Sequence, residues 1–257
     1  MNYAYKYQNT FDDPLAEEFR QILSLPPKFK ATDITGCSLW LDSSDALTKN
    51  IVNGKVLNWI DKTTGKNFAV QTADNAPVPG ELINGRETVN FLDGISYLLY
   101  SGSITYRECF AVCKIEDSGK LGQIIGSYSQ GIHLGIDMRT FGDITGHLSF
   151  DGNNSLALKA YFALNNAEYT ESSYANTIYS DVDYLTVGID IPQSISCYWN
   201  NSATTTEHYI SALLPSINIE TQNLVGDIGE IIVYDRLLTP EERATVRTYQ
   251  NQKWGIV

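Results

Sequence analysis

The chain has 257 residues, with 30 acidic and 18 basic side chains and a formal net charge of −12 at pH 7. Binding to nucleic acid or to an anionic membrane surface rewards clustered Lys and Arg, so this charge argues against both classes of partner. The length fits one large domain that can bury a sizeable core.

The first 33 residues differ from the rest and predict a helical arm. Asp12 or Asp13 can cap a helix that begins at Pro14, and Pro26 ends it. An amphipathic helix of about three turns is marginal alone, so its apolar stripe must dock on its own domain or on another chain; both alternatives stay open. The stripe consists of Leu15, Phe19, Ile22 and Leu23.

Export signals and disulfides are not expected. The N-terminus lacks the apolar run of a signal peptide, and no stretch approaches the length of a membrane span, which predicts a soluble product made in the cytoplasm. Cys109 and Cys113 would share one face of a strand but lie too far apart to bond. Cys37 and Cys197 sit in apolar strand patterns, so all four cysteines are expected to be reduced core residues.

From residue 34 onward, short strands alternate with turns rich in Gly, Asn and Asp. Turns are expected at Asn53-Gly54 and Asp93-Gly94, and a hairpin is expected around Pro192-Gln193. Many short strands, with helices only at the two ends, predict a sandwich or barrel. The expected strands cover 38–42, 56–61, 89–91, 97–100, 109–115, 123–128, 132–138, 147–150, 184–189 and 195–199.

The stretch 226–256 predicts a strand followed by a capped helix. The strand 228–234 should place Ile228, Glu230, Ile232 and Tyr234 on one face, with Ile231 and Val233 on the other. Thr239 and Glu242 can form a capping box around Pro240 at the first helical position.

Five sequence blocks follow one another along the chain: Leu39-Trp40-Leu41-Asp42-Ser43-Ser44-Asp45, Trp59-Ile60-Asp61-Lys62, Val89-Asn90-Phe91-Leu92-Asp93-Gly94, Gly229-Glu230-Ile231-Ile232-Val233-Tyr234-Asp235-Arg236 and Lys253-Trp254-Gly255. In this order they resemble the concanavalin A-like lectin/glucanase superfamily, specifically laminin-G-like domains of viral, phage and bacterial surface proteins. The resemblance implies a jelly-roll sandwich of two antiparallel sheets over residues 34–257, with residues 1–33 outside it. Because this fold hosts lectins, glycosidases and structural modules, it does not fix a function.

No catalytic residue is predicted. The glycosidases of this superfamily carry a Glu-x-Asp-x-x-Glu run, which is absent here, as are the common nucleophile, phosphate-loop and zinc motifs. On a regular strand Glu230 would point away from Asp227 and Asp235, so it could not share a glycosidic bond with either. We expect Glu230 to lie at a strand edge or to pair with Arg236 or Arg243.

Metal sites stay open. His133 and Asp137 would share a strand face, which fits either a catalytic or metal pair or the polar side of a half-buried strand. Relatives of this fold often hold calcium at the rim, and Asp143, Asp151 and the pair Asp181/Asp183 are candidates. None of them forms an EF-hand-like loop, so a solvated acidic loop is the alternative.

The 16 tyrosines are the feature most relevant to binding. Aromatic rings stack on sugars while their hydroxyls hydrogen-bond outward, so loops rich in Tyr, Asn and Ser suit glycan or protein contacts. The alternative is that scattered tyrosines merely cover a sheet. The candidate ligand-binding residues are Tyr161, Tyr169, Tyr174, Tyr179 and Tyr198, the last pointing outward while Cys197 and Trp199 point to the core.

Together these features predict a non-enzymatic virion structural protein, such as a capsid decoration, fibre or tail-associated protein. It would be assembled in the host cytoplasm, would be homo-oligomeric, and would contact other virion proteins through the arm. No cofactor other than calcium is foreseen. The alternatives are a lectin-like module that recognises a cell-surface glycan and, third, a degenerate glycoside hydrolase.

Overall fold

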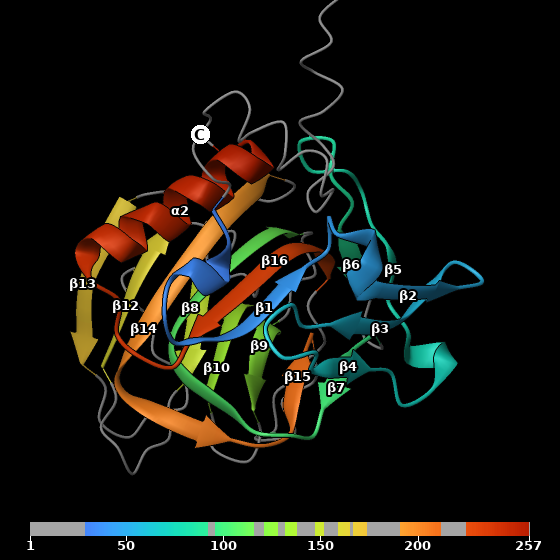
Figure 1. Cartoon of the computed structure of the whole chain (residues 1–257), viewed down its shortest axis with the longest axis horizontal. Helices are drawn as coiled ribbons and strands as arrows, with labels where there is room; N and C mark the ends of the chain where they lie inside the picture. The colour runs from blue at the N-terminus through green and yellow to red at the C-terminus, as the bar shows by residue number, and fades with distance from the viewer. Residues whose placement is uncertain are drawn as a thin grey trace, which may run out of the picture.

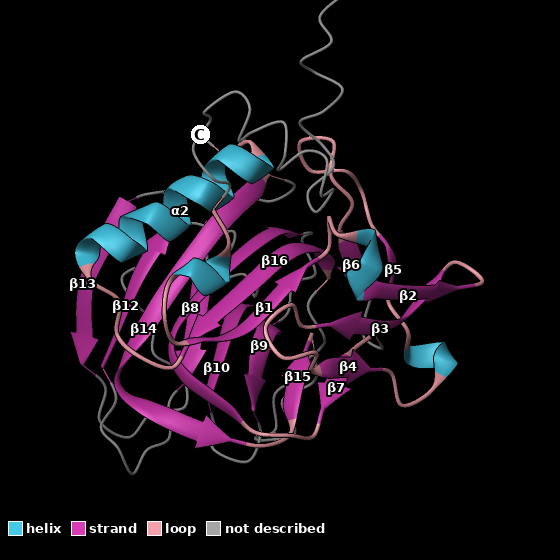
Figure 2. Cartoon of the chain, viewed as in Figure 1, coloured by secondary structure: helices cyan, strands magenta, loops and turns pink. Residues whose placement is uncertain are grey.

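The structure is a computed structural model of the chain (Figure 1). The described residues form two antiparallel eight-stranded sheets and one C-terminal α-helix, α2 (Pro240–Trp254), as Figure 2 shows. The expectation of an all-β sandwich of two antiparallel sheets with a C-terminal helix is therefore confirmed. The described ranges are 29–91, 96–115, 121–127, 132–137, 147–151, 159–164, 167–173, 191–211 and 225–256.

The two sheets are named sheet A and sheet B. Sheet A has the order β13 (Ala167–Ser173), β12 (Lys159–Leu164), β14 (Pro192–Thr205), β8 (Ile104–Ile115), β16 (Gly226–Tyr234), β6 (Val89–Phe91) and β5 (Val78–Pro79), and β1 (Cys37–Asp42) also pairs with β16. Sheet B has the order β11 (His147–Asp151), β10 (Ile132–Asp137), β9 (Leu121–Ser127), β15 (His208–Ile210), β7 (Leu98–Tyr100), β4 (Asn67–Ala69), β3 (Lys55–Ile60) and β2 (Lys49–Val52). Short 3₁₀ turns occur at η2 (Ala31–Asp33), η3 (Ala46–Thr48) and η4 (Ala73–Asn75).

The main core lies between the sheets. Alternate residues of each strand supply it, as the pleat requires when one face of each sheet is buried. Sheet A contributes Leu39, Phe91 and Val233, and sheet B contributes Trp59 and Phe68, all fully buried. Burial of this apolar surface is the main stabilising term for the sandwich.

Strand β16 carries a β-bulge, whereas a regular strand was expected over 228–234. Its pairing with β8 shifts register between Ile228 and Glu230, so Gly229 is the extra residue. A bulge reverses the in-and-out alternation beyond it. Ile228 therefore packs in the main core with Ile231 and Val233, and the expectation that Ile228 shares a face with Glu230 is wrong.

Helix α2 begins as predicted. The Thr239 hydroxyl accepts from the amide of Glu242, the Glu242 carboxylate accepts from the amide of Thr239, and Pro240 is the first helical residue. Gly255 ends the helix in the left-handed conformation, with φ of 67°. The helix lies along the outer face of sheet A (Figure 1), where two smaller apolar clusters form around Val246 and Trp254.

Local turn predictions had mixed outcomes. Asn53 and Gly54 both have positive φ, 51° and 74°, and join β2 to β3 as expected. The prediction of a hairpin turn at Pro192-Gln193 is wrong, because both residues belong to β14, where Gln193 pairs with Cys113. A proline is tolerated at the first residue of a strand, which explains the ambiguity. The expected turn at 93–94 and strand 184–189 lie outside the described residues.

The four cysteines are free, and only Cys37 is not fully buried, in agreement with the prediction. Strand β14 places Cys197 in the main core and Tyr198 on the opposite face of sheet A. None of the helices among the described residues is long and apolar enough to cross a bilayer.

The described part of the chain already contacts the sandwich before residue 34. The ring of Phe29 lies 4.9 Å from that of Tyr249 in α2, and the Ala31 carbonyl accepts from the Tyr234 hydroxyl at 3.0 Å. Ala31 is completely buried. The predicted arm residues Leu15, Phe19, Ile22 and Leu23 lie outside the described residues.

Candidate functional site

Glu230 of β16, one of the carboxylates considered above for glycoside hydrolysis, is completely buried beneath α2. Its Oε1 accepts from the indole of Trp40, the hydroxyl of Tyr249 and the ammonium of Lys253, each at 2.9 Å. Its Oε2 accepts from the Trp254 indole at 3.1 Å and from the Gln250 amide at 3.4 Å. Five donors around one carboxylate hold it in one fixed orientation.

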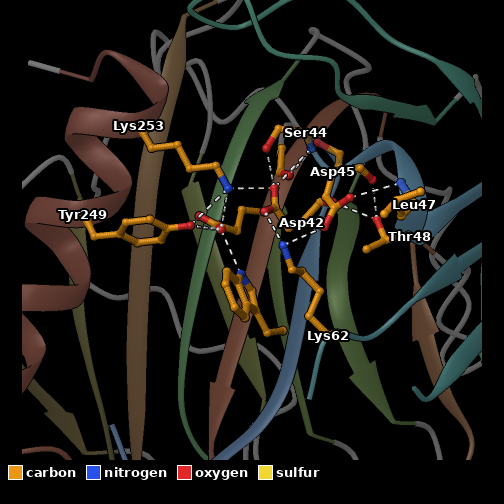
Figure 3. Close-up of polar contacts among 12 residues, drawn as sticks. Asp42, Ser44, Asp45, Leu47, Thr48, Lys62, Tyr249 and Lys253 are labelled. Carbon is orange, nitrogen blue, oxygen red and sulfur yellow. Dashed lines mark hydrogen bonds and ion pairs between the residues drawn. The ribbon is translucent and has the colours of Figure 1, made fainter. Parts of the chain in front are cut away.

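A second carboxylate, Asp42 at the end of β1, shares the ammonium of Lys253 (Figure 3). The Lys253 ammonium donates to Asp42 at 2.6 Å. The Lys62 ammonium lies 3.4 Å from the Asp42 carboxylate and 2.8 Å from the Asp45 carboxylate. Burial alone would raise the pKa of Asp42, but the two lysines and the Ser44 hydroxyl lower it to about 2. We call Asp42, Glu230 and Lys253 the helix lock, because they join β1, β16 and α2.

The bulge corrects one argument against catalysis. Asp227 pairs with Lys114, and Glu230 pairs with Val112, so both acidic residues lie on the outer face of sheet A. The expectation that the pleat separates them is wrong, because Gly229 is the unpaired extra residue. Asp227 is nevertheless buried, and its carboxylate accepts a hydrogen bond from the Thr88 hydroxyl at 2.8 Å. A Cβ on Gly229 would come within 2.9 Å of the Trp254 ring, so that ring covers the strand between the two carboxylates.

The expected partners of Glu230 were also wrong. Arg236 pairs with Glu242, with 2.6 Å between Nη2 and Oε1, and Arg243 pairs with Glu108 of β8. Glu108 is completely buried and also accepts from the Leu238 amide at 3.0 Å; burial raises the pKa of this carboxyl. These pairs fasten the start of α2 to sheet A, whereas the helix lock fastens its end.

Of the five predicted ligand-binding tyrosines, the described residues place Tyr161 and Tyr198 opposite each other in sheet A. Tyr198 is half-buried under α2, with the Arg243 guanidinium 4.5 Å from its ring centre. Tyr161 lies on β12 directly opposite Tyr198, and Tyr169 lies on β13. Tyr174 and Tyr179 lie outside the described residues, and the ligand-binding role of all five stays a prediction.

Predictions about metals also stay open. His133 and Asp137 lie on β10, where their register partners on β11 are Asp151 and His147. Among the described residues, no three His, Cys, Asp or Glu side chains are grouped closely enough to hold a metal ion. Asp143, Asp181 and Asp183 lie outside those residues, so calcium binding remains a prediction.

The outer face of sheet B carries a set of neutral polar and aromatic side chains that the sequence did not single out. One row of register partners crosses five strands of this face, and its members come from β2, β3, β4, β7 and β15 in turn. Such partners point to the same side of a sheet, so the row is continuous. The row consists of Asn50, Asn58, Ala69, Leu99 and Tyr209. Sequence reasoning missed it because the row depends on cross-strand pairings such as that of Leu99 with Tyr209, which lie far apart in the sequence, and no local pattern shows them.

His208 is a further buried polar residue missed by sequence reasoning. Its Nδ1 lies 2.9 Å from the Tyr106 hydroxyl and its Nε2 lies 3.0 Å from the Thr205 carbonyl. Burial lowers the pKa of His208 to about 4, so the ring is neutral at pH 7. Such an internal imidazole, satisfied on both nitrogens, acts as a structural link between β8 and β15.

No protein-family model matches the chain, and no curated protein sequence matches it either. Among solved structures, the chain is similar to domain 4 of AbnA, a GH43 extracellular arabinanase from Geobacillus stearothermophilus, in complex with arabinotriose. The TM-score is 0.35 and the identity 11%, over 82% of this chain and 98% of that chain. A likeness at this level identifies neither a family nor a ligand.

Proposed function

We propose that this protein is a non-enzymatic attachment module displayed on a virion as a capsid decoration, fibre or tail-associated protein. The observation that supports the non-enzymatic part is the state of Glu230, which is completely buried and surrounded by five donors. A general acid or nucleophile must reach the scissile bond. The Glu230 carboxylate is instead buried, and its oxygens accept hydrogen bonds from residues of α2.

The first test is hydrolysis. Incubation with a panel of β-glucans, xylans and arabinans should release no reducing ends, whether the chain is wild type or Glu230→Gln. The variant should instead lose about 2 kcal/mol of stability in urea denaturation, because an amide cannot accept from all the donors that face the carboxylate. Hydrolysis by the wild type that disappears in Glu230→Gln would overturn the non-enzymatic proposal.

Placement on a virion is supported by the resemblance of the sequence to laminin-G-like domains of viral and phage surface proteins. A lysate of cells that produce both the protein and the virus particles can be separated on a sucrose gradient. The protein should sediment with the particles, at a constant ratio of protein to particle. Recovery only at the top of the gradient would remove this part of the proposal.

The arm is proposed to carry the contact with other virion proteins or with further copies of the chain. Deleting residues 1–28 should leave the thermal midpoint of the sandwich nearly unchanged and abolish particle association. Deleting residues 1–33 should also lower the thermal midpoint, because the ring contact between Phe29 and Tyr249 and the hydrogen bond from the Tyr234 hydroxyl to the Ala31 carbonyl are lost. Thermal unfolding and gradient sedimentation of both truncations check this, and undiminished association of the shorter truncation would exclude the arm.

A further inference from the structure

The outer face of sheet B contains a chain of linked amides. The Asn50 amide donates to the Asn58 carbonyl oxygen at 3.2 Å, and the Asn58 amide donates to the Asn67 carbonyl oxygen at 2.9 Å. Asn50 and Asn67 are exposed at the two ends of this ladder. Each amide offers both donors and acceptors, and the two contacts use only part of that capacity. The ladder is thus fixed in orientation and can still bind ligand hydroxyls.

Beside the ladder, on the same face, lies a pair of aromatic rings. Tyr97 and Tyr209 have ring centres 6.2 Å apart with planes tilted by 51°. The Tyr97 hydroxyl donates to Gln71 at 2.6 Å, which fixes its ring. Ala69 and Leu99 separate the rings from the ladder with small and apolar side chains. The C–H groups of a sugar face suit such rings, because the aromatic face carries partial negative charge.

The absence of charged residues from the row and the length of the row indicate which class of ligand the outer face of sheet B would suit. No row position holds an acidic or basic residue, while the protein as a whole has a net charge of −12, which repels polyanions. Four strand spacings separate Asn50 from Tyr209, or about 19 Å, which exceeds the length of one sugar ring. Helix α2 packs on the other sheet, so it does not cover this face (Figure 1).

We propose that the outer face of sheet B binds a neutral oligosaccharide, with Tyr97 and Tyr209 stacking on sugar rings and Asn50, Asn58 and Asn67 hydrogen-bonding to hydroxyls. This proposal rests on the proposed attachment function and names the chemistry of its partner. It places binding on tyrosines other than the five expected from the sequence.

The experiment is an array of oligosaccharides probed with the full chain. Neutral fragments of three to six sugars from β-glucan, xylan, mannan, arabinan and galactan are compared with sialylated, sulfated and uronic acid-containing ones. Binding to at least one neutral class is expected, with competition by the same free oligosaccharide. Because no ion pair contributes, affinity should change less than about twofold between 0.05 and 0.5 M NaCl.

Variants then locate the site. Tyr209→Ala should weaken binding about tenfold through loss of stacking, and Asn58→Ala/Asn67→Ala should do so through loss of hydrogen bonds. Tyr209→Phe keeps the ring and should bind within about threefold of wild type. Thr105→Ala/Thr204→Ala is the matched control, since it removes an exposed cross-strand polar pair from sheet A, where the hydroxyls are 2.7 Å apart. Thermal unfolding confirms that each variant is folded.

Three results would overturn the proposal: no neutral oligosaccharide bound, binding of acidic glycans alone that high salt abolishes, or binding that the Tyr209 and Asn variants leave unchanged. These outcomes are separate from those of the proposed function. A chain that sediments with particles and hydrolyses nothing, but binds no neutral oligosaccharide, keeps the attachment function and loses this ligand.

Discussion

Lys253→Met is expected to destabilise the chain by about 3–5 kcal/mol, because removing one partner from a buried ionic cluster leaves the other charges uncompensated. The Lys253 side chain is 2% exposed, and its partners Asp42 and Glu230 are 1% and 0% exposed. Without the ammonium, Glu230 loses its cationic partner in the helix lock. Asp42 keeps Lys62 as a cationic partner and Ser44 as a hydrogen-bond donor. Urea denaturation followed by tryptophan fluorescence measures the loss, because Trp40 and Trp254 both donate to Glu230.

The matched control for Lys253→Met is Lys114→Met. It removes an ion pair with the same nitrogen-to-oxygen distance as that between Lys253 and Asp42, but with an exposed acidic partner. Lys114 lies 2.6 Å from Glu81, whose side chain is 72% exposed, so water replaces the lost partner. Its cost should stay below about 1 kcal/mol. Adding Glu230→Gln to Lys253→Met should recover part of the loss, since it removes a buried carboxylate that has lost its lysine partner. Equal costs for Lys253→Met and Lys114→Met would show that the helix lock does not stabilise the fold.

Trp254→Ala is the second substitution for which a large effect is expected, about 3–5 kcal/mol for truncating a buried tryptophan. The ring is 1% exposed, packs with Ile83, Val112 and Ile256, and covers Gly229. Its loss leaves a cavity between α2 and sheet A and removes one donor from Glu230 Oε2. Hydrogen exchange of the α2 amides should accelerate more than that of β8, because the helix loses its C-terminal attachment.

Trp254→Phe separates packing from hydrogen bonding. It keeps most of the ring volume but removes the indole donor, so its cost should fall to about 1–3 kcal/mol. Leu47→Ala provides the baseline for truncation of an apolar side chain that is 87% exposed, with a change within about 0.5 kcal/mol. If Trp254→Ala costs no more than Leu47→Ala, the C-terminus is held by contacts other than this ring.

The parts of the fold that depend on local chemistry could be predicted from the sequence. Thr239, Pro240 and Glu242 are sufficient to start a helix, because every contact of the capping box lies within four residues. The Asn53-Gly54 turn is similar, since both residues tolerate the positive φ that a tight hairpin needs. Alternation of apolar and polar residues located most strands for the same reason.

Features that depend on register could not be predicted. The bulge at Gly229 changes which residues accompany Glu230. A glycine inside an apolar strand pattern often marks a bulge, but it does not show whether or where the register shifts. Asp42 and Lys253 are 211 residues apart, and nothing near either one identifies the other as a partner. The amide ladder is hidden in the same way, because its asparagines stand in three different strands.

The central position of β16 in sheet A has a consequence for the order of folding. This strand pairs with β8 on one side and with β1 and β6 on the other, and the contact between Trp40 and Glu230 joins residues 190 positions apart. During synthesis, β1 therefore emerges long before its partner and stays unpaired until β16 follows. Non-local pairing of this kind slows folding and leaves strand edges exposed to misassociation. Completion of sheet A, and with it the docking of α2, must be a late step in the folding of this chain.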